Sequence, residues 1–243
     1  MLLISPAWRA PLMCGCAVGA AAFAALAATL GVGGSTSFDA WMFREMYARV
    51  GSGGAATLLD ISTPAISIAL LALVAVVAAL LRRWEVVALA AVGPGITVLL
   101  TREVFKPMLG REFVVDGFSA LDGFSTTGSF PSGHESAVAS ASLVLAIVVG
   151  RLPLGRRARA AVFTVLVAWI VVAALGLVRN FYHYATDTIG AICLAAAVVP
   201  ATALAIDAIT RRSAARRSPS AAPSVDQQDR TVTTQRLGPV DHP

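Results

Sequence analysis

Charged residues are scarce in this 243-residue chain. Asp, Glu, Lys and Arg together make up 14% of it, whereas hydrophobic residues make up 57% and the mean hydropathy is +0.75. A soluble globular domain usually carries about 25% charged residues. The composition therefore excludes an ordinary soluble domain and predicts an integral membrane protein, surrounded by membrane lipid and without a nucleic-acid partner.

Cysteine is also scarce. The three cysteines, Cys14, Cys16 and Cys193, all lie in apolar stretches, where a thiol usually acts as a small apolar side chain. The spacing of Cys14 and Cys16 is not that of a metal site. We assign none of the three a functional role.

Apolar stretches recur along the chain at close to the length that a membrane span needs, about 20 residues. They predict an all-α, polytopic helical bundle with about six transmembrane helices. The third stretch is short and is interrupted at residues 93–95 by Gly-Pro-Gly, and the first could instead be a cleaved signal peptide. The six stretches are 11–32, 64–81, 86–101, 134–150, 161–178 and 188–209.

The chain divides into three expected parts. Residues 1–63 hold the first transmembrane helix and an amphipathic segment around 36–50, which either lies in the membrane interface or packs over the bundle. Residues 64–210 form the helical core. Residues 211–243 are rich in Ser, Pro, Gln and Arg, and we expect them to be a disordered cytoplasmic tail.

Basic residues set the expected orientation, because Lys and Arg favour the cytoplasmic side of a membrane. Arginines follow the second and fourth stretches and begin the tail, so both termini are expected to be cytoplasmic. The links after the third and fifth stretches then lie outside. These two links also carry basic residues, which calls for a separate explanation: Arg102, Lys106, Arg111 and Arg179.

Residue types that support catalysis gather on this expected outer side. Lys106 is the only lysine of the chain, and Arg111 follows it by five residues. Two of the three histidines, His134 and His183, lie on the same side, and Asp187 follows His183 by four residues. The sequence therefore predicts that a functional site forms at the extracytoplasmic face.

Each of these residues also has a purely structural interpretation. Ser132 and Glu135 fit a capping box at a helix start, and Asp187 could be a helix N-cap. Lys106 and Arg111 could anchor the chain at the lipid headgroups. The case for function rests on all of them meeting at one membrane face.

The combination suits phosphate chemistry. A helix N-terminus binds phosphate through its unpaired backbone N–H groups, and Gly133 lets an anion approach the backbone closely. Two histidines suit a nucleophile and a general acid, and a carboxylate at the i+4 position can orient one of them. A metal site is less favoured, because no further ligand cluster is evident and the nearby basic residues would repel a cation.

These residues resemble a known family. The series Lys106 to Arg111, then Pro-Ser-Gly-His at 131–134, then His183-x-x-x-Asp187 is similar to the three-part signature of the type 2 phosphatidic acid phosphatase and vanadium haloperoxidase superfamily. The resemblance covers about residues 60–210. The combination of the second and third motifs is more specific than either motif alone.

The resemblance implies a role for each motif residue. His183 would be the nucleophile that forms a phosphohistidine, Asp187 would orient it, and His134 would be the general acid. The lipid phosphatases of this family need no metal or other cofactor. The residues implied in phosphate binding are Lys106, Arg111, Ser132, Gly133 and Arg179.

Two departures from the family pattern make the expected pocket less basic. Phe113 and Val114 stand where the first motif usually has a second arginine and a proline. In the third motif, Leu177 occupies the usual arginine position, and the nearest arginine is Arg179. Both departures put substrate range and rate in question but leave the nucleophile, its partner and the acid in place.

The sequence thus predicts a membrane phosphatase that hydrolyses a lipid phosphomonoester or pyrophosphate, such as phosphatidic acid or a polyprenyl pyrophosphate. Three alternatives stay open: a non-catalytic lipid-handling or transport protein, an inactive member of the superfamily, and a haloperoxidase that holds vanadate. The choice of lipid, the direction of phosphoryl transfer and the oligomeric state do not follow from the sequence.

Overall fold

Every regular element in the described residues is helical, which confirms the all-α prediction. The computed structural model describes residues 2–30, 34–113 and 128–217. The elements in chain order are α1 (Pro6–Leu30), α2 (Ser37–Arg49), α3 (Ser52–Ile61), α4 (Pro64–Leu80), α5 (Trp84–Leu99), the π-helical turn η1 (Leu100–Phe105), α6 (Lys106–Leu109), α7 (Gly133–Val149), α8 (Arg156–Arg179) and α9 (Ala185–Arg217).

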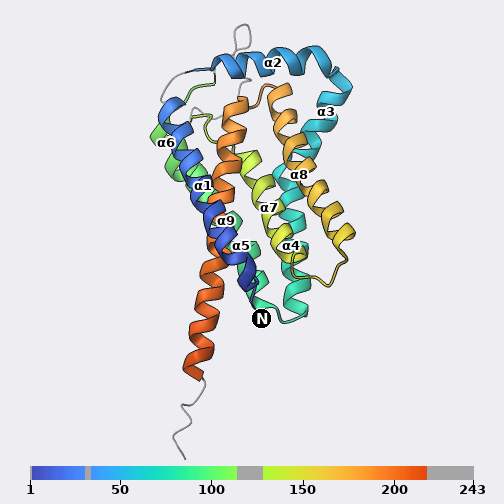
Figure 1. Ribbon diagram of the computed structural model, residues 1–243. Helices are drawn as coiled ribbons and strands as arrows, with labels where there is room; N and C mark the ends of the chain where they lie inside the picture. The colour runs from blue at the N-terminus through green and yellow to red at the C-terminus, as the bar shows by residue number, and fades with distance from the viewer. Residues whose placement is uncertain (1, 31–33, 114–127, 218–243) are drawn as a thin grey trace, which may run out of the picture. The chain divides into compact units, whose positions relative to one another are not determined.

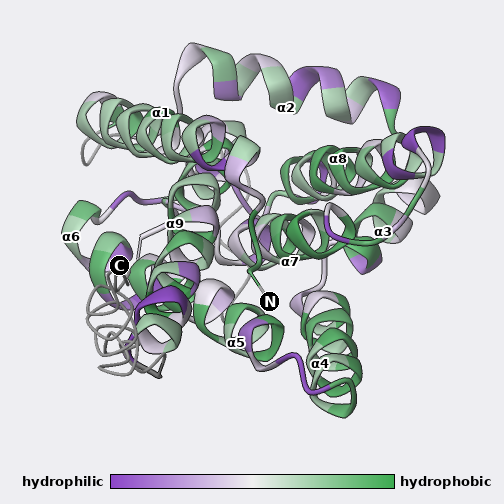
Figure 2. Ribbon diagram, turned by 60° about the horizontal axis from the view of Figure 1, so that its bottom comes forward, coloured by the Kyte–Doolittle hydropathy of each residue, from purple (hydrophilic) through white to green (hydrophobic). Residues whose placement is uncertain are grey.

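Within the residues that the structure describes, six apolar helical segments match the six expected spans. Five are long and apolar enough to cross a membrane: Pro6–Leu30, Ser52–Leu80, Trp84–Leu109, Arg156–Arg179 and Ala185–Arg216. The sixth is α7, whose 17 residues extend over about 25 Å, at 1.5 Å per residue. Figure 2 shows hydrophobic colouring along most of the bundle helices, with hydrophilic segments on α2 and at several connections.

The Gly-Pro-Gly interruption does not break the third span. The helix α5 continues through Pro94 and passes directly into η1 and α6. One turn after the start of this interruption, Thr97 donates its hydroxyl to the Gly93 carbonyl oxygen at 3.0 Å, within the same helix. The helical path ends at Gly110, whose left-handed φ of 55° suits a glycine C-cap. This continuous path carries Lys106 to the end of the bundle.

The amphipathic segment forms α2, which lies across one end of the bundle (Figure 1). Asp39 and Met46 are buried on its inner side, and Met46 packs with Val178 and Ala185. The exposed side carries Phe38, Trp41 and Tyr47. The segment therefore packs over the bundle, and its outer face is aromatic.

The helix α7 is the centre of the core. It packs against α4, α5 and α8, and Val144 lies in a buried cluster with Leu89 of α5 and with Val199 and Ala203 of α9. The first turns of α7 are buried as well, at Glu135, Ser136 and Val138, and this end of α7 is the one nearer to α2 (Figure 1). The arginine-bearing α4–α5 and α7–α8 connections lie at the opposite end (Figure 1).

The chain divides into two compact units, Met1–Ala208 and Ile209–Pro243. In the second unit the described residues continue the helix α9 as far as Arg217. The helix thus passes the expected start of the tail at residue 211. The rest of the predicted tail, residues 218–243, lies outside the described residues.

One glycine allows α8 to approach α3 closely, and its substitution tests this packing. A Cβ added to Gly176 would lie 2.6 Å from the carbonyl oxygen and 2.9 Å from the Cβ of Leu58. We expect Gly176→Ala to destabilise the protein by about 1–3 kcal/mol, because the two helices must separate. The measurement is the Tm of the detergent-solubilised protein.

A second helical glycine provides the matched control. A Cβ on Gly95 of α5 would meet no heavy atom within 4 Å. Gly95→Ala is expected to leave the Tm unchanged or slightly higher, because alanine favours a helix over glycine by about 0.8–1 kcal/mol. Equal Tm values for the two variants would contradict the close approach of α3 and α8.

Candidate active site

The Pro-Ser-Gly-His motif forms the N-terminus of α7 and is tied to α9. The Ser132 hydroxyl oxygen accepts a hydrogen bond from the Glu135 N–H at 3.3 Å, as an N-cap should. The Ser132 N–H donates to the backbone carbonyl of Asp187 at 3.1 Å. The Glu135 carboxyl is fully buried and has no hydrogen-bond partner. Only one half of the expected capping box therefore forms.

His183 and Asp187 face each other at the start of α9. The His183 Nδ1 atom lies 3.5 Å from Asp187 Oδ2, which is longer than the usual hydrogen bond of about 2.7–3.2 Å. The same carboxylate oxygen accepts a hydrogen bond from the Tyr184 N–H at 3.0 Å. Asp187 is fully buried and His183 is 5% exposed. With Asp187 at the Nδ1 side, the Nε2 atom of His183 is the nitrogen left for other partners.

The two histidines come together from different helices. The ring centroids of His134 and His183 are 6.3 Å apart, in an edge-to-face arrangement. The half-buried Lys106 is close enough for its charge to act on both His134 and Asp187. A hydrogen bond of 3.0 Å between the hydroxyls of Thr101 and Ser136 joins the segment before Lys106 to α7.

Gly133, the first residue of α7, has open space beside it. A Cβ added at Gly133 would meet no heavy atom within 4 Å, so an anion can approach the first N–H groups of α7 closely. His134 follows directly in the chain. The structure thus brings together seven of the eight predicted site residues, all except Arg179: Lys106, Arg111, Ser132, Gly133, His134, His183 and Asp187.

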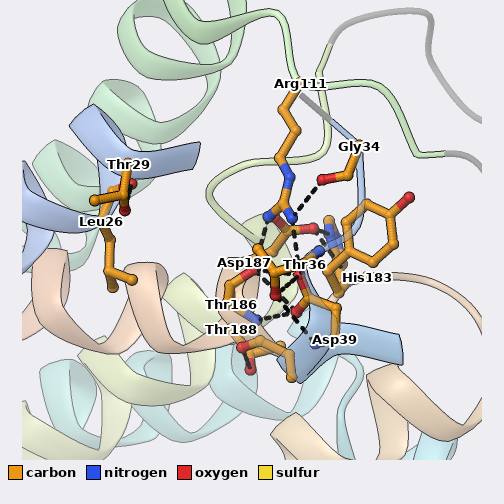
Figure 3. A network of polar contacts seen from close by, with 12 residues as sticks. Leu26, Thr29, Gly34, Thr36, Asp39, Arg111, His183, Thr186, Asp187 and Thr188 are labelled. Atoms are coloured by element: carbon orange, nitrogen blue, oxygen red, sulfur yellow. Dashed lines mark hydrogen bonds and ion pairs between the residues drawn. The ribbon is translucent and has the colours of Figure 1, made fainter. Parts of the chain in front are cut away.

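Arg111 is buried inside an ion cluster (Figure 3). Its Nη1 donates to Asp187 Oδ1 at 2.6 Å and to the Thr186 hydroxyl at 2.7 Å. Its Nη2 donates to Asp39 Oδ2 at 2.9 Å and to the Gly34 carbonyl at 3.0 Å. Both terminal nitrogens are therefore occupied by protein groups, and the expectation that Arg111 binds phosphate directly stays a prediction.

Asp39 is ionised within this cluster. Burial alone would raise the pKa of its carboxyl, but hydrogen bonds from the Thr186 N–H, from Thr36 and from Arg111 together hold that pKa below its ordinary value. The cluster thus places one guanidinium between two buried carboxylates. A buried charge of this kind is tolerated only when it is paired and hydrogen-bonded.

Arg179, the other arginine expected at the phosphate, anchors α2. Its Nε donates to the Val50 carbonyl at 2.7 Å, and its guanidinium carbon lies 4.7 Å from the centre of the Tyr47 ring. Leu177, at the usual arginine position of the family, is fully buried. In this arrangement Arg179 joins the end of α8 to the end of α2.

Phe113 belongs to an aromatic cluster beside the ion cluster. Its ring centroid lies 4.6 Å from that of Tyr184 and 6.1 Å from that of Phe43. The guanidinium carbon of Arg111 lies 4.4 Å from the centre of the Tyr184 ring. The residue that replaces the second motif arginine thus packs apolar surface around Arg111. Its neighbour Val114 lies outside the described residues.

Sequence reasoning missed two members of the cluster, Asp39 and Thr186. Thr36-x-x-Asp39 signals a capping box, and that box is present. Nothing in the spacing of Asp39 indicates that its carboxylate reaches α9, 147 residues away in the chain. Thr186 stands inside the His183-x-x-x-Asp187 motif, at a position for which that motif specifies no residue type.

A profile of the PAP2 superfamily matches residues 86–211, which is slightly more than half of the chain. The chain belongs to this superfamily. A solved structure of a transmembrane PAP2-type phosphatidylglycerolphosphate phosphatase from Bacillus subtilis has the same fold, with a TM-score of 0.64. The two chains are 18% identical, and the similarity covers 81% of this chain and 96% of the other.

A search of curated protein sequences found no match. The family profile and the structural similarity confirm the resemblance seen in the motifs, the helical membrane fold and the assignment to a family of phosphatases. Within the part of the chain that the structure describes, His, Cys, Asp and Glu side chains form no group of three or more suited to a metal ion. Metal independence stays a prediction.

The ion cluster predicts that Arg111 is needed first for stability. Arg111→Gln would leave Asp39 and Asp187 as two buried carboxylates without their shared cation. We expect a loss of about 3–5 kcal/mol in the free energy of unfolding, which is the usual cost of removing one partner from a buried ion pair. Thermal unfolding in detergent measures it. An unchanged Tm together with a raised KM for a lipid phosphate would instead indicate that Arg111 binds substrate directly.

The lowered pKa of Asp39 predicts how stability depends on pH. The folded pKa lies below the ordinary value of 3.8, so the ionised carboxylate stabilises the fold fully near neutral pH. This contribution is lost as the pH falls from the unfolded value through the folded one. The Tm difference between wild type and Asp39→Asn is therefore expected to be larger at about pH 6 than at about pH 3.

A neighbouring carboxylate on the same helix gives the control for this pH series. Glu45 pairs with Arg49 at 2.7 Å, but the Arg49 side chain is 78% exposed. Exposed pairs of this kind stabilise by about 1 kcal/mol or less, so Glu45→Gln should stay close to wild type at both pH values. A constant Tm difference for Asp39→Asn across the series would contradict the assignment.

Proposed function

We propose that this membrane protein is a lipid phosphate phosphatase that works through a phosphohistidine at His183. The substrate would be a lipid phosphomonoester or pyrophosphate. The observation that carries the proposal is the meeting of two histidines from different helices, 6.3 Å apart between ring centroids, with Asp187 on the Nδ1 side of one of them. Membership of the PAP2 superfamily supports the same reaction class.

The first chemical step forms the covalent intermediate. The Nε2 lone pair of His183 attacks phosphorus, the P–N bond forms, and the bond from phosphorus to the leaving oxygen breaks. His134 gives its proton to that leaving oxygen. Asp187 holds the imidazole with Nδ1 protonated and stabilises the positive charge that develops on the ring. This role needs a hydrogen bond between His183 Nδ1 and Asp187 Oδ2. The two atoms are 3.5 Å apart, and we expect the distance to shorten once substrate is bound.

The second step releases phosphate. His134, now neutral, takes a proton from water while the water oxygen attacks phosphorus. The P–N bond breaks, inorganic phosphate leaves, and His183 returns to its starting state. One histidine thus serves as acid in the first step and as base in the second.

Lys106, the Gly133 N–H and the Ser132 hydroxyl are the groups that we propose to hold the phosphate oxygens. The N-terminus of α7 adds its helix dipole. In this proposal Arg111 does not contact the phosphate and acts by binding Asp187. Arg179 would act only on the position of α2.

The site would face the extracytoplasmic side of the membrane. It lies at the end of the bundle where α2 crosses, whereas the arginine-bearing connections lie at the other end (Figure 1). Since arginine-rich connections favour the cytoplasm, both termini would then be cytoplasmic. A site at this end of the bundle would lie near the headgroup level, where the phosphate group of a lipid lies.

Phosphate release from defined lipids tests the proposal. Purified protein in detergent is incubated with phosphatidic acid, a polyprenyl pyrophosphate or phosphatidylglycerol phosphate, in the presence of EDTA. We expect release from at least one lipid, and a loss of at least about a thousand-fold in His183→Ala, because the nucleophile is gone. His242→Ala, which removes the remaining histidine of the chain, is the matched control.

The outcomes separate the alternatives. No release from any of the three lipids by folded wild type would favour an inactive relative or a lipid-handling protein. Equal release by wild type and His183→Ala would remove His183 as the nucleophile. Loss of release on addition of EDTA, restored by a divalent cation, would contradict the metal-independent mechanism.

A further inference from the structure

Asp39 is a fully buried carboxylate on a helix that is otherwise largely exposed. It lies on α2, before residues 86–211, the region that the PAP2 profile matches. The neighbouring Phe38 and Trp41 are 41% and 48% exposed, whereas Asp39 is 0% exposed. A carboxylate in such a place needs strong partners, and its partners lie in the catalytic region.

Both carboxylate oxygens of Asp39 are used. The Oδ1 atom accepts hydrogen bonds from the Thr186 N–H at 2.9 Å and from the Thr186 hydroxyl at 3.0 Å. The Oδ2 atom accepts from Arg111 Nη2 at 2.9 Å and from the Thr36 N–H at 3.0 Å. Asp39 therefore holds the residue next to Asp187 and, through Arg111, Asp187 itself.

A continuous chain of contacts leads from α2 to the nucleophile (Figure 3). Asp39 binds Arg111, and Arg111 Nη1 donates to Asp187 Oδ1 at 2.6 Å. The second oxygen of Asp187 faces His183 at 3.5 Å. Each link in the chain constrains the orientation of the next.

The same series of contacts also links the charges of Asp39, Arg111 and Asp187. Arg111 lies between two carboxylates, so its positive charge is shared between Asp39 and Asp187. Without Asp39, the whole charge of Arg111 would act on Asp187. Asp187 would then be a weaker acceptor for the Nδ1 proton of His183 and would stabilise the charged imidazole less.

We propose that Asp39 is a positioning residue for phosphoryl transfer, which sets the orientation and the effective charge of Asp187 through Arg111 and Thr186. This inference rests on the proposed phosphatase function. It makes α2 part of the catalytic architecture.

Helix capping alone does not account for these contacts. Thr36 and Asp39 form a capping box that satisfies the first turn of α2. A capping box needs one carboxylate oxygen and no partner outside the helix. The bonds to Arg111 and Thr186 reach across the fold and bury the carboxylate completely, which a cap at the exposed start of a helix does not require.

The pH profile reports this role because His183 must be neutral to attack. The titratable groups that face His183 are Asp187 on α9 and His134 on α7. Lys106 on α6 acts on both of these neighbours, and Arg111 acts through Asp187. Removing the Asp39 charge strengthens the electrostatic interaction of Arg111 with Asp187. Asp187 then stabilises the protonated imidazole of His183 less. The acidic limb of the kcat/KM profile should therefore move to lower pH.

Kinetics of Asp39→Asn on phosphatidic acid in detergent, or on whichever lipid wild type hydrolyses, test the proposal. We expect kcat to fall by about 10- to 100-fold, as for a catalytic group held slightly out of place, while KM stays within about 2-fold of wild type because no phosphate contact is removed. The acidic limb of the kcat/KM profile should move to lower pH. Glu45→Gln, which removes a carboxylate from the same helix, should match wild type in all three quantities.

Asp39→Glu is the second variant. It keeps the charge but carries it one methylene further from the backbone, so its acidic limb should stay at the wild-type position while kcat is at least about 3-fold lower. If Asp39→Asn does not fold, this variant carries the test alone. A wild-type kcat in Asp39→Glu would then overturn the proposal.

The possible failures are distinguishable. Wild type that releases no phosphate would overturn the proposed function, and this inference with it. Active wild type, inactive His183→Ala and an Asp39→Asn variant with wild-type kcat and pH profile would overturn the inference alone. A uniform loss of rate at every pH, with the acidic limb unmoved, would show that Asp39 supports only the fold.

Discussion

The burial of one guanidinium between two carboxylates is the interaction on which the rest of the site depends. Arg111 has no exposed surface, and a cation placed there is tolerated only because Asp39 and Asp187 share its charge at 2.9 and 2.6 Å. The three residues come from α2, from the segment after α6 and from α9. Their pairing fixes α2 across the end of the bundle and fixes the carboxylate that faces His183. The same ion cluster thus holds α2 in place and positions the carboxylate beside His183.

This arrangement explains how the chain departs from the pattern of its superfamily. Phe113 stands where a second motif arginine is usual and packs against Tyr184 beside the Arg111 guanidinium. Arg179, the nearest substitute for the arginine missing at position 177, contacts the Val50 carbonyl at the end of α2. Arg111 and Arg179, the two arginines of the expected pocket, are thus both bonded to protein groups. The positive charge for phosphate would then come from Lys106 and from the N-terminus of α7, which predicts a pocket with fewer fixed ionic contacts than is usual in the family.

The sequence predicted correctly those features that depend on residues close together in the chain. Span length and hydropathy predicted six apolar helices, and the spacing of His183 and Asp187 predicted that they face each other. It failed where partners are distant in the chain. The capping pattern of Thr36 and Asp39 is fully explained by the first turn of α2, so nothing in it indicates a contact with Arg111, 72 residues away. The Gly-Pro-Gly interruption suggested a weak third span, yet α5 continues through Pro94 into η1, as membrane helices can when other groups satisfy the backbone around a proline.

The most direct test of the ion cluster is the Tm of the Asp39→Asn and Arg111→Gln double variant, compared with that of each single variant. Removing Arg111 alone leaves two buried carboxylates facing each other, so neutralising one of them should relieve the fold. We expect Asp39→Asn to lower the Tm of wild type but to raise the Tm of Arg111→Gln, a change of sign that independent residues do not give. If Asp39→Asn lowers the Tm by the same amount in both backgrounds, the two residues act independently, which would contradict a shared ion cluster.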